Sequence, residues 1–114
     1  MTSTDVCLGI VGPCASGKTT LVAFLRALDY QVRHIAQEHS YVPDMWKRIG
    51  NPDLLIYLDV SYEVSIQRTP TSWEREIFNK QVERLKHARD NADLYIDTND
   101  LTSQQVLDIV LEYL

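Results

Sequence analysis

A glycine-rich segment restricts what this chain can fold into more than any other feature. Residues 12 to 19 read Gly-Pro-Cys-Ala-Ser-Gly-Lys-Thr, a full match to the phosphate-binding pattern of a glycine, four free positions and Gly-Lys-Ser/Thr. The pattern has meaning only between a strand and a helix. Residues 6 to 11 form a short apolar run typical of a buried parallel strand. Downstream, apolar residues recur at helical spacing, at Leu21, Val22, Leu25 and Leu28.

The residue types in this segment, which we call the phosphate loop (residues 12–19), suit a polyphosphate. The first N–H groups of a helix have no intrahelical partner, and the helix dipole favours an anion there. Lys18 would place its charge near the β and γ phosphates, and Thr19 would offer a hydroxyl to Mg²⁺. The alternative, a glycine-rich helix start without a ligand, explains neither residue. We expect the nucleotide to contact Gly12, Pro13, Cys14, Ala15, Ser16, Gly17, Lys18, Thr19 and Thr20.

Size and composition predict one domain, residues 1–114, of ordinary globular character. The chain has 114 residues, of which 45% are apolar, and a formal net charge of −5. The negative charge argues against nucleic acid as a partner, which needs a basic face. No apolar stretch approaches the roughly 20 residues of a membrane span, and residues 1 to 5 lack a signal-peptide profile. We therefore expect a cytoplasmic protein without a membrane partner; Cys7 and Cys14 make no disulfide framework.

Strand and helix signals alternate along the chain. Strands are predicted at residues 6–11, 31–36, 54–58 and 94–96. Helices are predicted after the phosphate loop, at 43–49, from 61, from 71 or 72, and from 102. The last two carry the apolar stripes Phe78, Val82, Leu85 and Ala88, and Val106, Ile109, Val110 and Tyr113. The alternation predicts an α/β fold, a three-layer sandwich around a small parallel sheet of about four strands.

Two further segments add a family resemblance. Together with the phosphate loop, residues 52–61 (Pro-Asp-Leu-Leu-Ile-Tyr-Leu-Asp-Val-Ser) and 92–98 (Ala-Asp-Leu-Tyr-Ile-Asp-Thr) resemble the P-loop kinases of small molecules, near the nucleoside monophosphate kinases and the shikimate kinase branch. The resemblance implies the P-loop NTPase fold and Mg²⁺-dependent transfer of the γ phosphate of ATP to a small, nucleotide-like acceptor. It also implies arginines in a mobile lid, here Arg68 and Arg75, and an adenine pocket that draws on residues 97–100.

The chain departs from that family in its middle. Only about 17 residues separate Ala36 from Leu54, where family members fit an acceptor-binding insertion and a further strand. If one strand is lost, we expect the order second, first, third, fourth across the sheet. Glu38 would then emerge near the Mg²⁺ site at the carboxyl edge, where ligands gather in such sheets. We predict that Glu38 is a catalytic or metal-site carboxylate; the alternative is a solvated turn.

Other candidate residues have two interpretations each. Asp59 follows an apolar strand, as the acidic metal-site residue of many P-loop proteins does, although in the resembled kinases it supports the site. Arg68 and Arg75 could clamp phosphate or stack on a base. The alternative is that both arginines lie on an exposed helix face and pair with Glu63 or Glu76. The three histidines, His34, His39 and His87, show no metal-ligand spacing. The two tryptophans, Trp46 and Trp73, are interpreted as packing anchors.

The leading hypothesis is therefore a small kinase that uses ATP and Mg²⁺. The second is a nucleotide-binding module that hydrolyses slowly or not at all and acts through a protein partner, because the shortened middle leaves little room for an acceptor. Edges of a small open sheet stay exposed, so a homodimer is one expected state.

Overall fold

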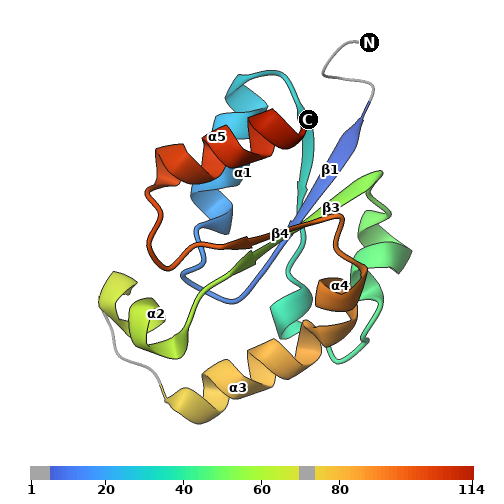
Figure 1. Cartoon of the computed structure of the whole chain (residues 1–114). Helices are drawn as coiled ribbons and strands as arrows, with labels where there is room; N and C mark the ends of the chain where they lie inside the picture. The colour runs from blue at the N-terminus through green and yellow to red at the C-terminus, as the bar shows by residue number, and fades with distance from the viewer. Residues whose placement is uncertain (1–5, 70–73) are drawn as a thin grey trace.

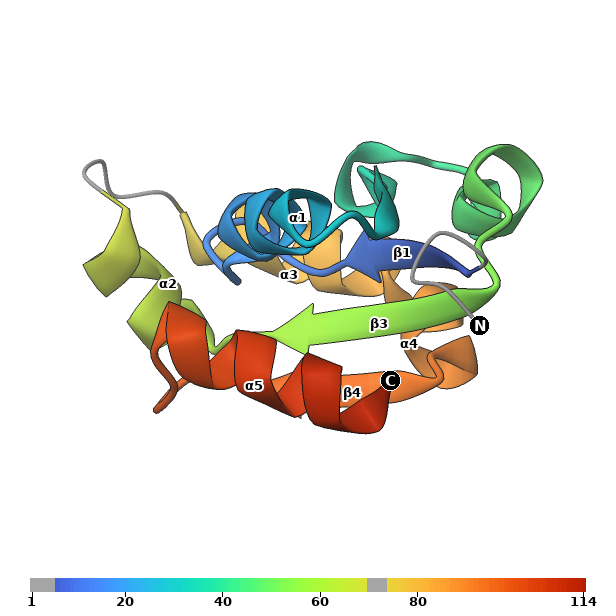
Figure 2. The same ribbon diagram turned by 90° about the horizontal axis from the view of Figure 1, so that it is seen from above.

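The computed structural model describes residues 6–69 and 74–114, which form an α/β fold around a four-stranded parallel sheet (Figure 1). The strands are β1 (Cys7–Val11), β2 (Gln31–His34), β3 (Leu54–Asp59) and β4 (Leu94–Asp97). Their order across the sheet is β2-β1-β3-β4, which confirms the order expected from the shortened middle. Figure 2 shows the arrowheads of β1 and β3 pointing the same way. Helical connections make this parallel arrangement possible.

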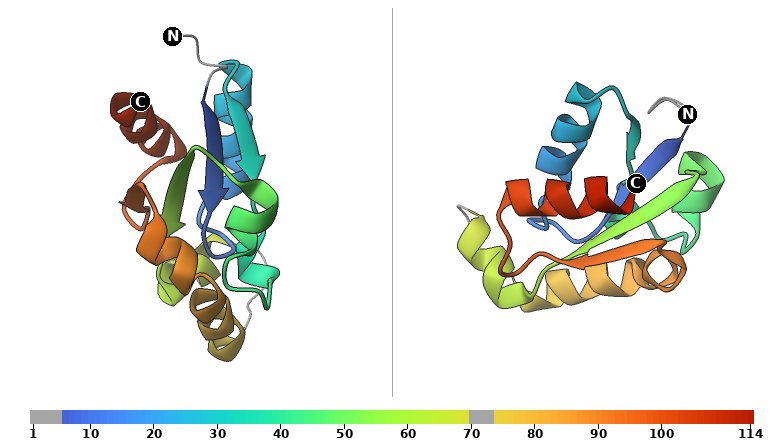
Figure 3. Two further views of the ribbon diagram at one scale, coloured as in Figure 1. Left: turned by 90° about the vertical axis from the view of Figure 1, so that its right-hand side faces the viewer. Right: turned by 45° about the horizontal axis from the view of Figure 1, so that its top comes forward.

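Helices lie on both sides of the strands. On one side are α1 (Lys18–Ala27) and α5 (Ser103–Tyr113). On the other are α3 (Arg75–Arg84), α4 (Lys86–Asn91), the 3₁₀ turn η2 (Gln37–His39) and a single π-helical turn, η3 (Trp46–Gly50). The right-hand view of Figure 3 shows α5 and the α3–α4 pair on opposite sides of β4. A short helix, α2 (Tyr62–Arg68), follows the carboxyl end of β3.

Two apolar clusters fill the spaces between these layers. One joins α1 and α5 to the sheet and contains Leu8, Ile10, Leu21, Val22, Leu25, Val32, Ile56, Leu58, Ile96, Val106, Leu107 and Val110. The other lies on the opposite face and contains Val11, Ile35, Trp46, Leu55, Tyr57, Leu85 and Ala88. Neighbouring strand residues such as Leu55 and Ile56 belong to different clusters, because successive side chains of a strand point to opposite faces. Burial on both faces explains why β1 and β3 are continuous apolar runs.

Several local predictions are confirmed. Ser61 caps α2 by accepting a hydrogen bond from the Val64 amide, and Thr102 with Gln105 forms a capping box at α5. Trp46 is buried and packs as a core anchor.

Other local predictions are confirmed only in part, are wrong or fall outside the described residues. The helix predicted at 43–49 is found in part, as the π-helical turn η3, which begins later because the Trp46 amide donates to the Gln37 side chain instead of entering a regular helix from residue 43. The long helix is divided at Leu85, and Tyr113 is 45% exposed. Thr71, Ser72 and Trp73 lie outside the described residues. Within the described part of the chain, no helix combines the length and apolar character that crossing a membrane requires.

Candidate functional site

The phosphate loop curls tightly between β1 and α1. Its backbone enters the positive-φ region three times, with φ of 155° at Gly12, 67° at Ala15 and 97° at Gly17. A Cβ at Gly12 would overlap the carbonyl oxygen of Leu58 at the end of β3, so only glycine fits there. At Gly17 the space beside the Cα is open within 4 Å. No side chain caps the start of α1, so its first N–H groups face the loop without a side-chain acceptor.

Lys18 folds back into the loop that precedes it. Its ammonium donates to the carbonyl oxygens of Gly12 and Pro13 and lies 2.6 Å from Oε2 of Glu38. Both side chains of this ion pair are buried, with 6% and 5% exposed. The second carboxylate oxygen, Glu38 Oε1, is buried and has no hydrogen-bond partner. The predicted carboxylate therefore reaches the phosphate loop, and it is not a solvated turn residue.

The turn after β2 is fixed by Gln37, which is fully buried. Its side-chain amide donates to the carbonyl oxygens of Val42, at 2.9 Å, and Arg84, at 3.2 Å. Its side-chain oxygen accepts from the Trp46 amide at 2.8 Å. These three bonds hold η2 against η3 and α3, so Glu38 is presented to the loop by a satisfied polar network.

Sequence reasoning missed Gln81, which joins α3 to the phosphate loop. Its Oε1 accepts from the Cys14 amide at 3.0 Å, and its Nε2 lies 3.3 Å from the Cys14 sulfur. The side chain is 4% exposed. The sequence did contain a signal for this contact, because Gln81 is a polar residue at helical spacing from the apolar Phe78 and Leu85. A polar residue on a buried stripe needs partners, and here the partner is the loop.

Arg68 joins the other side of the phosphate loop to the segment after β4. Its guanidinium donates to the carbonyl oxygen of Ala15 at 3.1 Å and to both the hydroxyl and the carbonyl oxygen of Thr98. Thr98 is 1% exposed and donates its hydroxyl to the Asp59 carbonyl. Of the two arginines predicted for the lid, Arg68 thus contacts the loop.

Two cavities flank the phosphate loop and share Ala15, Gly17 and Thr20 in their walls. The larger, about 480 Å³, lies toward Arg68 and is also lined by Ser16, Leu21, Thr69, Thr98, Leu101, Thr102, Ser103 and Val106. The smaller, about 310 Å³, lies toward Glu38 and is also lined by Pro13, Cys14, Lys18, Thr19 and His34. Desolvation, followed by the charge of Lys18, lowers the pKa of His34. The loop is therefore the shared wall of one elongated site.

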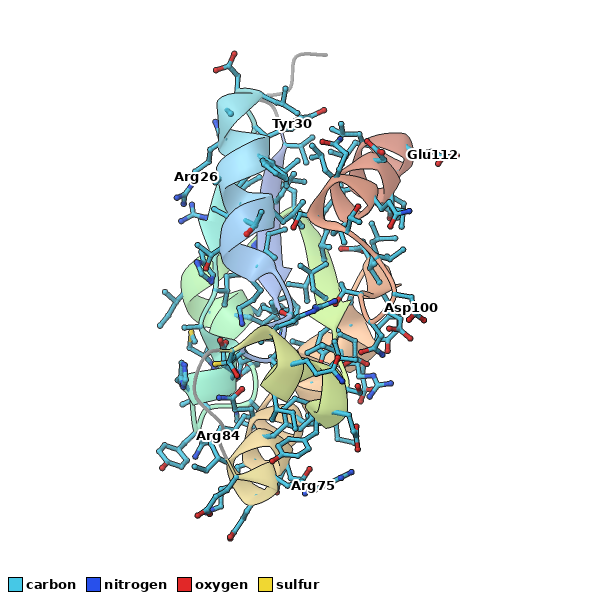
Figure 4. The ribbon with its side chains drawn as sticks, turned by 90° about the vertical axis from the view of Figure 1, so that its left-hand side faces the viewer. Arg26, Tyr30, Arg75, Arg84, Asp100 and Glu112 are labelled. Atoms are coloured by element: carbon cyan, nitrogen blue, oxygen red, sulfur yellow. The ribbon has the colours of Figure 1, made fainter. Side chains whose placement is uncertain are left out.

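The structure places Asp59 and Arg75 away from these cavities. Asp59 accepts hydrogen bonds from the Val60 amide and the Tyr95 hydroxyl, so both carboxylate oxygens are occupied. Burial, then the hydrogen bond to Asp59, raises the pKa of Tyr95 to about 12, which keeps that hydroxyl a donor. Arg75 forms an exposed ion pair with Glu63 at 3.2 Å, the alternative weighed for it from the sequence. Figure 4 labels Arg75 and Arg84 on α3 and Asp100 after β4. A lid role for Arg75 stays a prediction.

The residues present fit a polyphosphate with its metal ion. Besides Glu38 Oε1, the Ser16 hydroxyl is buried in the loop without a partner, and buried polar groups rarely stay unpaired. Thr19 is exposed at the start of α1 and lines the smaller cavity, where its hydroxyl can reach a cation. Comparison of the chain with protein-family models and with curated proteins gives no match to either.

Proposed function

We propose that this chain is a nucleotide-binding P-loop protein that, with Mg²⁺, transfers the γ phosphate of ATP to a small-molecule acceptor. The observation that carries the proposal is the buried Lys18 ammonium, held inside a positive-φ loop at a helix start beside an incompletely paired carboxylate. A structural lysine would be expected at the surface, because burying an ammonium is costly. A phosphate-binding lysine has to be inside the loop.

In this proposal the larger cavity receives the nucleoside of ATP. Its walls combine the apolar Leu101 and Val106 with the Arg68 guanidinium and the Thr98 backbone. A planar guanidinium can stack on a base or contact phosphate, and backbone groups can pair with the base edge. Adenine is the base that the resemblance implies, and no contact of the described residues in the cavity selects it over guanine.

The smaller cavity then receives the terminal phosphate and the cation. Lys18 exchanges Glu38 for phosphate oxygens, and the start of α1 donates its N–H groups to the phosphates. Thr19 and Glu38 would hold the cation, directly or through water. Bound Mg²⁺ would neutralise charge on the phosphates. Where a water lies between Glu38 and the cation, this carboxylate, which lines the smaller cavity, can take the hydroxyl proton of an acceptor.

A second function is favoured by one observation, the short connection between β2 and β3. Residues 37–53 contain only η2 and η3, with no further helix or strand to enclose an acceptor. A nucleotide-binding module that signals through a protein partner needs no such enclosure. In that case a protein partner supplies the acceptor enclosure that the short connection lacks, or no phosphoryl transfer occurs.

Calorimetry with ATP and Mg²⁺ tests the shared part of both functions. Lys18→Met should abolish measurable binding while circular dichroism shows a folded chain. The matched control is Lys86→Met, an exposed lysine of α4 whose only described ion pair is with Asp90 at 3.8 Å. Equal affinity in all three proteins would refute nucleotide binding at the phosphate loop.

Formation of ADP with a panel of nucleoside monophosphates and small alcohols separates the two functions. The kinase proposal predicts that at least one acceptor accelerates ADP formation above the rate in buffer alone. A uniform rate across the panel, with intact ATP binding, would favour the binding module.

A further inference from the structure

Three different ligand types meet where η2 approaches the phosphate loop. The Cys14 sulfur, a carboxylate oxygen of Glu38 and a ring nitrogen of His39 all lie within 4.8 Å of one another. We call these three residues the Cys–Glu–His cluster. They come from two separate segments, so spacing along the sequence does not reveal them. Thiolate, carboxylate and imidazole are the three ligand types that Zn²⁺ uses in proteins.

The ligand atoms of the cluster lie within 4.8 Å of one another, which is wider than in a closed metal centre. Bonds of about 2.0–2.3 Å in a tetrahedral site separate neighbouring ligand atoms by roughly 3.3–3.8 Å. His39 Nε2 lies 3.9 Å from Glu38 Oε2. The imidazole is 61% exposed, so it can rotate toward the carboxylate without unpacking the core. Small side-chain movements therefore suffice to close the cluster on a cation.

Two of the three ligands are already oriented. Gln81 contacts both the amide and the sulfur of Cys14, and Lys18 holds Oε2 of Glu38. Metal ligands in proteins are usually held by such outer contacts, which set their orientation. The Lys18 ammonium also offsets part of the negative charge that a thiolate and a carboxylate would otherwise bring together.

A second, independent observation concerns the other carboxylate oxygen of Glu38. Its Oε1 atom is buried, yet it has no hydrogen-bond partner. Leaving such an atom without a partner is costly, and a bound ligand would remove that cost. Lys18 pairs with Oε2, the same oxygen that lies 3.9 Å from His39 Nε2, so Oε1 is the carboxylate oxygen that a cation could engage without breaking the ion pair, once the side chains turn to close the cluster.

We infer that the Cys–Glu–His cluster is a binding site for a thiophilic divalent cation, Zn²⁺ or a similar ion, with three protein ligands and an open fourth position. This inference goes beyond the proposed function, and the cation binds without nucleotide. The site shares Glu38 and the wall of the smaller cavity with the proposed phosphate site. A cation there engages the carboxylate that Mg²⁺-ATP would use, so the two ligands oppose each other.

Cobalt spectroscopy on the reduced chain of 114 residues tests the cluster without nucleotide. Co²⁺ bound to a cysteine thiolate gives a sulfur-to-metal charge-transfer band, and Zn²⁺ should remove it by displacement. Cys14→Ser should abolish the band. Cys7→Ser is the matched control, because Cys7 lies in β1 outside the cluster, and it should keep the band unchanged.

Zinc titration by calorimetry tests the other ligands. His39→Ala should weaken Zn²⁺ binding on the order of tenfold or more, the loss typical of removing even an outer contact. Because the His39 side chain is exposed, the variant should fold like the native chain. No thiolate band in the native chain, or a band that survives Cys14→Ser, would overturn the inference. So would Zn²⁺ affinity unchanged by His39→Ala. None of these results depends on ATP binding.

Discussion

The ammonium of Lys18 and the carboxylate of Glu38 lie 2.6 Å apart in the mouth of the phosphate loop, and both are buried. The lysine of the loop is therefore paired with a residue of η2, the 3₁₀ turn that follows β2. A polyphosphate bound there would have to exchange with this carboxylate, or share the lysine with it. The proposed nucleotide binding and the position of Glu38 would thus be coupled by one pair of charges.

The interaction between Lys18 and Glu38 can be measured in the free energy of unfolding. Breaking a buried ion pair by removing one partner costs about 3–5 kcal/mol, because the other charge stays buried. Lys18→Met and Glu38→Gln should each destabilise the chain, and the double variant should be more stable than the sum of the two losses predicts. Urea denaturation of the four proteins gives the coupling energy. Additive losses would show that the two side chains do not interact.

The two glycines of the loop should differ in their tolerance of alanine. Gly12→Ala combines φ of 155° with overlap on the Leu58 carbonyl, whereas Gly17→Ala meets φ of 97° in open space. Backbone strain of this kind costs about 1–3 kcal/mol. We expect Gly17→Ala to lose an amount in that range and Gly12→Ala to lose more. Thermal denaturation of both variants checks the order, and a smaller loss for Gly12→Ala would contradict the described loop.

Arg68 should contribute to nucleotide affinity more than to folding. Its hydrogen bonds to Ala15 and Thr98 hold together the two segments that would enclose the base. We expect Arg68→Ala to weaken ATP binding about tenfold or more, equivalent to about 1.4 kcal/mol. Arg48→Ala, which removes an exposed arginine paired with Asp44, is the control and should bind like the native chain. Equal affinities for Arg68→Ala and Arg48→Ala would exclude Arg68 from the site.

Thr19 should matter only when the cation is present. Its hydroxyl is predicted to reach Mg²⁺, while the N–H groups of α1 and Lys18 contact the phosphates without it. Thr19→Ala should therefore bind ATP like the native chain in EDTA but gain much less affinity on addition of Mg²⁺. Calorimetry in both buffers measures this difference. An equal Mg²⁺ effect in the two proteins would remove Thr19 from the cation site.

The parts of the fold that sequence predicts well are those with a local cause. A short continuous apolar run between turn residues, such as residues 54–58, is typical of a strand buried on both faces, and capping residues such as Ser61 and Thr102 indicate a helix start directly. The strand order followed from chain length, since the short middle leaves no room for a fifth strand. The prediction that Glu38 approaches the loop depended on that order.

The parts that sequence did not reveal depend on contacts between distant segments. Gln81 is an ordinary polar helix residue until α3 is placed against Cys14. His39 has no ligand spacing until η2 is folded beside the phosphate loop. In the same way, the Trp46 amide finds an acceptor in Gln37, and this tertiary bond outweighs the helix signal of residues 43–49. Local patterns cannot report such bonds, because both partners become neighbours only in the folded chain.

A nuclear magnetic resonance titration tests the central claim most directly. The chain, labelled with ¹⁵N, is titrated with Mg²⁺ and a non-hydrolysable ATP analogue, and the amide shifts are followed residue by residue. The account predicts the largest shifts at residues 14–20, with a second group near Thr98 and at the Arg68 side chain. If those amides stay unchanged at saturating millimolar analogue, or if shifts gather elsewhere, the phosphate loop does not bind a nucleoside triphosphate.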